Sequence, residues 1–178
     1  MTRFPWAAWG LLVVVLDLPL YGWDVLPDLV GYAWVFYGLT GAAAVHPAFV
    51  RARAAAVAGA PLSLVTGTPL FAGSQWAPVL FAGFLLAAIA FVVVVHQVLT
   101  GLLAVAPDDA ADTLRWAAPL RTAVLVTGAV VVIGIVAVAT PVGIAYPVGV
   151  LANVLVGILT VVLLHRVARA GWIAPASD

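Results

Sequence analysis

The sequence predicts an all-α membrane protein, a bundle of six transmembrane helices that forms one domain over residues 1–178. Hydrophobic residues make up 66% of the 178 positions and charged residues only 8%, whereas a soluble domain has ~45–50% apolar and ~25% charged residues. A soluble core of this size could not bury so much apolar surface, because the buried fraction rises slowly with chain length. We therefore expect lipid to be the solvent for most of the chain.

Long stretches without a charged residue predict the number of spans. Between Arg53 and Asp108 lie 54 uncharged residues, and between Arg121 and Arg166 another 44. A helix needs about 20 residues to cross a ~30 Å hydrocarbon core, so each stretch should hold two spans separated by a turn rich in Gly and Pro. Together with two crossings before Arg51, the expected spans are residues 4–20, 27–45, 54–71, 78–99, 117–139 and 146–165.

The positions of the arginines predict the orientation. Six alternating spans place all seven arginines on one side of the membrane, and positive residues near span ends are retained in the cytoplasm. Both termini are therefore expected in the cytoplasm. Leu-Thr pairs recur at residues 39–40, 99–100 and 159–160, so the spans could form three duplicated helical hairpins; chance recurrence in such a Leu- and Thr-rich chain is the alternative.

The segment between the first two expected spans, residues 17–32, contains the most unusual polar residues. Pro27 and Asp28 suit the first turn of a helix, where proline needs no amide donor and a carboxylate meets the positive end of the helix dipole. An acid-capped helix start is one interpretation, and an outward-facing cation or amine site built from Asp17, Asp24 and Asp28 is the other. Asp17 is expected just inside the membrane boundary, where an ionised carboxylate is costly and usually faces the bundle interior.

Polar residues in later spans suggest further candidates. Asn153 is the main polar group of the last span, either in an interhelical hydrogen bond or in contact with a solute. His96, Gln97 and Thr100 lie toward the inner end of the fourth span. They could line an inner vestibule or relay a proton; alternatively, His96 simply reaches interfacial water.

The sequence contains no recognisable catalytic motif. It contains no cysteine, which excludes thiolate chemistry, and it has no phosphate-binding glycine loop, nucleophile–base set or metal-ligand spacing. We expect a non-enzymatic protein without catalytic residues, metal or cofactor. The formal net charge is zero, so the sequence has no excess of positive charge that would indicate nucleic-acid binding. The lipid bilayer is the expected partner, and a short interfacial helix within Asp108–Arg121 could dock a membrane or cytoplasmic protein or be a solvated connector.

One motif resembles a known group of proteins. Residues 24–32, Asp-Val-Leu-Pro-Asp-Leu-Val-Gly-Tyr, resemble the first hairpin of small prokaryotic multi-spanning membrane proteins that carry Asp-(Ile/Val)-(Ile/Leu)-Pro-Asp-(Phe/Leu)-(Ile/Val)-Gly-Tyr before an apolar helix. The resemblance implies a prokaryotic plasma membrane location and singles out this turn, including Tyr32, as the candidate site. It implies no particular activity.

A second resemblance concerns the whole topology. Six spans, inner termini and 178 residues look like the substrate-binding subunits of energy-coupling-factor transporters. The stripe of small residues expected on their first helix is not evident between Leu11 and Leu20. Transport or binding of a small solute or cation is therefore the main alternative to a membrane protein of unassigned role, and an assembly or regulatory subunit is the third.

Overall fold

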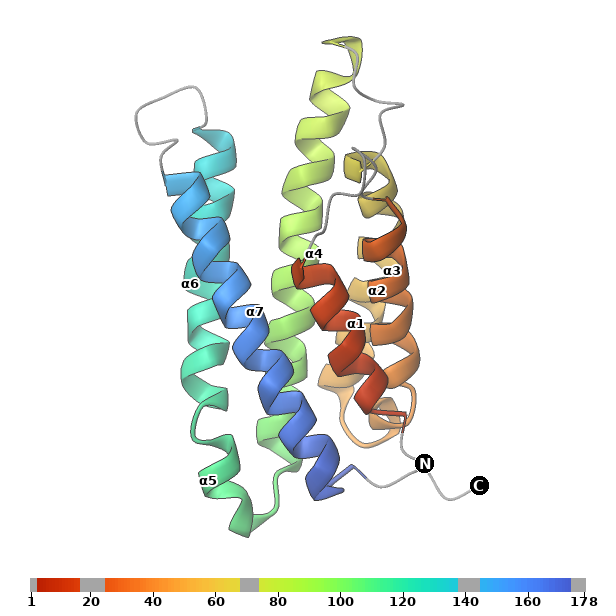
Figure 1. The fold of residues 1–178 in the computed structure, drawn as a ribbon, viewed down its shortest axis with the longest axis vertical. Coiled ribbons are helices and arrows are strands. Elements are labelled where there is room, and N and C mark those ends of the chain that lie inside the picture. The colour runs from red at the N-terminus through yellow and green to blue at the C-terminus, as the bar shows by residue number, and fades with distance from the viewer. Residues whose placement is uncertain (1–2, 17–24, 68–73, 138–144, 174–178) are drawn as a thin grey trace.

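The main helices of this protein form one closed ring. The structure, a computed structural model, describes residues 3–16, 25–67, 74–137 and 145–173. The ring contains α1 (Pro5–Leu16), α2 (Val25–Gly38), α3 (Pro47–Gly67), α4 (Ala77–Val105), α6 (Ala117–Val136) and α7 (Ala145–Ala170). Each packs against the next along the chain, and α7 closes the ring against α1 (Figure 1). The described residues include no β-strand, so the predicted all-α class is confirmed.

Short helical segments lie between the main helices. They are the 3-10 turns Ala42–Ala44, Ser74–Trp76 and Asp108–Ala110, and the single α-helical turn α5 (Ala111–Leu114). The interfacial helix expected between α4 and α6 is therefore only one 3-10 turn followed by one α turn. Consecutive pairs of main helices, α1–α2, α3–α4 and α6–α7, pack as three antiparallel hairpins (Figure 1).

Proline marks the start of every main helix. It is found within the first three residues of each one, at positions 5, 27, 47, 78, 119 and 147. The amide of such a residue would have no partner within the helix, so the missing N–H costs nothing there, and the fixed φ favours helix entry. Pro61 is the exception, because it lies inside α3. These prolines therefore favour helix starts at the positions where the structure has them.

Four helices are long and apolar enough to cross a membrane by length and composition: α3, α4, α6 and Pro147–Ala170 of α7. The apolar α1 has 12 described residues, and the expected end of its span, residues 17–20, lies outside the described part of the chain. Helix α2 has 14 residues and ends at Gly38, before the expected residue 45. Conversely, α3 begins at Pro47 instead of residue 54 and so includes Arg51 and Arg53. Charge does not interrupt backbone hydrogen bonds, and a long arginine side chain can reach polar surroundings from within a helix.

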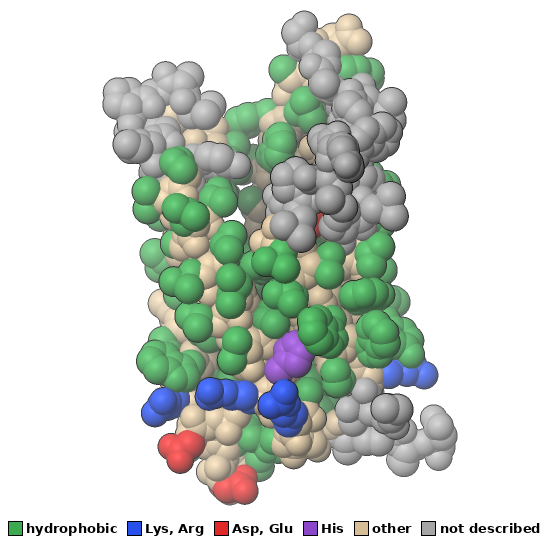
Figure 2. Space-filling view, viewed as in Figure 1, with side chains coloured by type: hydrophobic (Ala, Val, Ile, Leu, Met, Phe, Trp, Pro, Cys, Tyr) green, Lys and Arg blue, Asp and Glu red, His purple; other side chains and the backbone are tan. Residues whose placement is uncertain are grey.

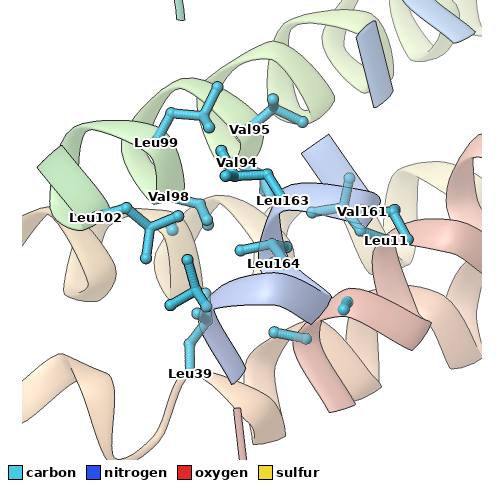
Figure 3. Packing of buried hydrophobic residues seen from close by; sticks show 14 of the residues in the cluster. Leu11, Leu39, Val94, Val95, Val98, Leu99, Leu102, Val161, Leu163 and Leu164 are labelled. Carbon is cyan, nitrogen blue, oxygen red and sulfur yellow. The ribbon is translucent and has the colours of Figure 1, made fainter. Parts of the chain in front are cut away.

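The tightest packing lies toward one end of the ring, near the arginines. Leu39, Leu99, Leu102 and Leu164 are fully buried there, together with Phe49, and we call these five residues the arginine-end core. Valines at positions 94, 95 and 98 complete it, and Leu11 and Leu163 extend it along α1 and α7 (Figure 3). The side chains come from α1, α3, α4 and α7 and from the turn after α2, so this end of the bundle is filled by apolar packing.

Charged side chains are distributed unevenly along the bundle axis. Helix α1 begins and α7 ends at the same end of the bundle, where α5 also lies (Figure 1). On the face shown in Figure 2, the basic side chains form a band at this end, and acidic side chains lie beyond the band, farther from the apolar body. Such a sequence of layers (apolar, basic, acidic) is what a protein surface needs where hydrocarbon gives way to headgroups and water.

Candidate functional site

Two adjoining cavities lie inside the ring, away from the arginine-end core. Their volumes are about 180 and 220 Å³. Both are lined by Asp28 of α2, Ala87 and Ala88 of α4, Val131 of α6 and Val150 of α7. We call this pair of cavities the Asp28 cavity, after the carboxylate that is common to them.

The Asp28 cavity lies deep within the bundle. On α6, Val131 is ten residues beyond Arg121, and on α7, Asn153 is thirteen residues before Arg166. At a rise of 1.5 Å per residue these intervals correspond to roughly 15–20 Å along the helix axis. The cavity is therefore well removed from the arginine end of these helices. An acid predicted at a surface turn is thus a wall residue of an interior cavity.

Asp28 is placed in this cavity by the start of its helix. It is the acidic residue in the first turn of α2, as the sequence predicted, and its Oδ1 atom is buried. Backbone N–H groups of a first helical turn have no partners within the helix, and they and the dipole favour a carboxylate. The described lining of both parts contains no arginine.

Tyr32 lies one turn after Asp28 on the same face of α2 and also lines the cavity. Its side chain is only 4% exposed. The ring lies against Gly59 of α3, where an added Cβ would be 2.6 Å from the ring atom Cζ of Tyr32. Glycine at position 59 therefore lets the aromatic ring pack directly on the α3 backbone and fixes one wall of the cavity.

Asn153 lines the cavity from α7. Thr127 of α6 donates a hydrogen bond from Oγ1 to Asn153 Oδ1 at 3.0 Å, and Oγ1 is also 2.9 Å from the carbonyl oxygen of Ala123. This contact is the interhelical hydrogen bond expected for Asn153, and it orients the amide beside the cavity. Thr127 could not be identified from the sequence, because a threonine in a helix commonly bonds its own backbone. Its contact with Asn153 across the α6–α7 interface is what distinguishes it.

Hydroxyl groups from α3 line the other part of the cavity. Ser63 donates to the carbonyl oxygen of Ala60 at 2.7 Å, and Thr66 donates to that of Leu62 at 3.2 Å. Since each hydroxyl proton is used within α3, these groups offer acceptor lone pairs to a bound solute. Asp28 and Tyr32 from one candidate segment and Asn153 from the last span are thus brought together. Ser63 and Thr66 line the same cavity, and Thr127 supports it through Asn153.

His96, Gln97 and Thr100 do not line the Asp28 cavity. The Thr100 hydroxyl donates to the carbonyl oxygen of His96 at 2.8 Å. Within the described part of the chain, His96 Nδ1 and Gln97 Oε1 are buried without a hydrogen-bond partner. The three residues are neighbours on α4, and the proposed inner vestibule stays a prediction.

Two sequence candidates, Asp17 and Asp24, lie outside the described residues. The loop proposed as a docking surface is described: Asp108, Asp109 and Asp112 are exposed there. Among residues 3–16, 25–67, 74–137 and 145–173, no three His or Asp side chains come together in a way that could hold a metal ion.

The Asp28 cavity therefore offers an acid, a phenol, an amide and hydroxyl acceptors between apolar walls. Such a set can neutralise and hydrogen-bond a small cation. Comparison of the chain with protein-family models, curated proteins and solved structures finds no match.

Proposed function

We propose that this chain is a non-enzymatic integral membrane protein that binds a small cationic solute in the Asp28 cavity, as a transporter or as the solute-binding subunit of one. The observation that carries this proposal is the Asp28 carboxylate, whose Oδ1 atom is buried and which lines a cavity between apolar walls inside the ring. Acids inside a membrane are expensive and usually mark a pathway or a partner. A bound cation would offset the cost of placing this one there.

The shape and chemistry of the cavity favour a small occupant. Each of its two parts, of about 180 and 220 Å³, is smaller than the ~300–1,000 Å³ of pockets that take drug-sized ligands. Tyr32 and Phe91 bring aromatic rings to the wall, and aromatic faces attract ammonium groups. An ammonium or a short primary amine fits these walls, whereas a large anionic metabolite does not.

We also propose six spans, with both termini in the cytoplasm of a prokaryotic cell. The ring of six main helices supports this topology, because α1 and α2 run alongside four helices long enough to cross. The arginine band at the end where α1 begins and α7 ends supports the orientation (Figure 2). The resemblance of residues 24–32 to the first hairpin of prokaryotic membrane proteins supports the cellular location.

The topology can be tested by labelling single cysteines in intact cells, since the natural chain contains none. Gln75→Cys, near the start of α4, should react with a membrane-impermeant maleimide added outside. Arg51→Cys and Arg115→Cys should react only after the membrane is permeabilised, because their positions belong to the arginine end. The opposite pattern would overturn the six-span topology.

Cation binding should be measured on the purified protein as a shift in thermal unfolding. Ammonium, methylammonium, sodium and potassium chlorides are compared at constant ionic strength, with N-methylglucamine chloride as the bulky reference. A ligand at ten times its Kd should stabilise the folded state by about 1.4 kcal/mol. We expect a saturable rise for ammonium or methylammonium, and the absence of any selective rise would refute the proposal.

Asp28→Asn locates the site. We expect it to weaken cation binding at least tenfold while the unliganded protein stays folded, because the amide keeps the size and the acceptor oxygen of the side chain and loses only its charge. Asp112→Asn is the matched control, since this aspartate is exposed near the arginine end and does not line the cavity. If Asp28→Asn binds as the natural protein does, the site lies elsewhere.

A further inference from the structure

A second concave site lies at the arginine end, on the outer surface of the ring. It is a groove of about 220 Å³, which we call the α6–α7 groove, lined by Trp116, Leu120, Leu159, Val162, Leu163 and Arg166. Thr113 of α5 contributes one further polar group. Apart from Thr113 and Arg166, these residues present an apolar surface that could accommodate an alkyl chain.

The groove faces outward, away from the Asp28 cavity. Leu159, Val162 and Arg166 lie three and four residues apart on α7 and therefore share one face. Leu159 is 44% and Val162 47% exposed, so the rest of the bundle leaves this face uncovered. In a membrane, the material nearest to such a face is lipid.

Arg166 forms no salt bridge with any residue in the described part of the chain, although Asp108, Asp109 and Asp112 belong to the same end of the bundle. In Figure 2 the acidic side chains at this end lie beyond the basic band, on the side away from the apolar body. The Arg166 guanidinium is thus exposed at the apolar boundary, with no acidic partner among the described residues. A guanidinium fork matches two phosphate oxygens in geometry and charge.

Aromatic and basic residues beside the α6–α7 groove indicate that the groove lies at the level of a membrane interface. Trp116 is 54% exposed, and the guanidinium of Arg115 lies over its ring, 5.4 Å from the centroid. An exposed indole next to arginines is typical of the depth at which glycerol and phosphate groups lie. The apolar part of the groove therefore matches the acyl chain of a phospholipid, and its cationic end matches the phosphate.

We propose that the α6–α7 groove binds an anionic glycerophospholipid, with an acyl chain against Leu159 and Val162 and the phosphate at Arg166. Basic pockets between helices at the cytoplasmic side are suited to such headgroups. An acidic protein segment fits less well, because the exposed aspartates of the loop would repel it and the apolar floor would stay uncovered. This site is independent of the solute proposed for the Asp28 cavity.

The proposal can be tested by native mass spectrometry of the full-length protein, delipidated in mild detergent. Phosphatidylglycerol and phosphatidylcholine with identical acyl chains are added in turn, and the bound fraction is compared. We expect phosphatidylglycerol to bind about fivefold more tightly, the contribution of one basic residue near an anionic headgroup. The preference should fall as ionic strength rises, which tests the charge without any substitution.

Variants separate the two parts of the site. Arg166→Gln should abolish the preference for phosphatidylglycerol, whereas Arg169→Gln, one turn further along α7 and outside the groove, should keep it. Val162→Trp should fill the groove and weaken both lipids. The proposal would be overturned if Arg166→Gln kept the preference for phosphatidylglycerol or if Val162→Trp bound both lipids as the natural protein does. It would also be overturned if inorganic phosphate competed as well as phosphatidylglycerol, which would indicate a site for free phosphate.

Discussion

Gly38→Ala is expected to destabilise the protein by about 3 kcal/mol, a large effect for one methyl group. A Cβ at Gly38 would lie 2.8 Å from both the Cα and the Cβ of Ala7 and even closer to its backbone nitrogen. The obstacle is the backbone of α1, which cannot rotate away as a side chain could, so the two helices must separate. Overpacking of cores typically costs ~1–3 kcal/mol, and a clash with backbone belongs at the upper end.

Thermal unfolding of the detergent-solubilised protein measures this effect. A loss of ~3 kcal/mol corresponds to a midpoint about 6–12 °C lower for a protein of this length. Gly41→Ala is the matched control: the substitution is the same and only three residues away, but nothing lies within 4 Å of the added Cβ. Equal shifts in the two variants would show that α1 and α2 do not approach this closely.

Leu102→Ala should cost about 2–3 kcal/mol, because it removes a fully buried side chain from the arginine-end core (Figure 3). Leu→Ala in soluble cores costs ~2–5 kcal/mol, which includes both transfer from water and the void left behind. In a bilayer the transfer contribution is small, since lipid tails are as apolar as leucine. The void and its lost dispersion contacts remain, so we expect the lower half of that range.

Leu151→Ala is the control for this prediction. Leu151 of α7 is 70% exposed, so lipid can occupy the space that the lost methyl groups leave. Its unfolding midpoint in lipid nanodiscs should stay close to that of the natural protein, while that of Leu102→Ala falls. If both variants lose the same stability, burial within the bundle is not what makes Leu102 important.

Much of the helical architecture could be predicted because lipid imposes a simple rule on length and charge. Each of the six predicted spans overlaps one main helix. The ends were less accurate, since hydrocarbon thickness limits the apolar stretch and not the helix itself: α4 continues to Val105, six residues beyond its expected end. Helix α2 ends at Gly38 instead of Val45, and a turn with the 3-10 segment Ala42–Ala44 follows it.

The candidate site was predicted less completely. Asp28 and Asn153 are conspicuous because polar residues are rare in such a chain, and this rarity makes them visible without a structure. Their meeting in one cavity depends on the order of helices around the ring, which hydropathy does not encode. The depth of Asp28 was also missed, because a Pro-Asp pair at a helix start is typical of a surface turn.

The closure of the ring by α1 and α7 has a consequence for biosynthesis. The rings of Trp9 and His165 meet edge to face at 5.1 Å across this contact, and Val15 occupies the space beside Gly157. Every other contact around the ring joins successive main helices and can form while the chain is being inserted. The α1–α7 contact can form only after α7, the last main helix, has been inserted. Before it forms, Asp28 lacks the α7 wall and lies open to lipid, which is unfavourable for a carboxylate. A nascent chain stalled before α7 should therefore be a target for membrane proteases.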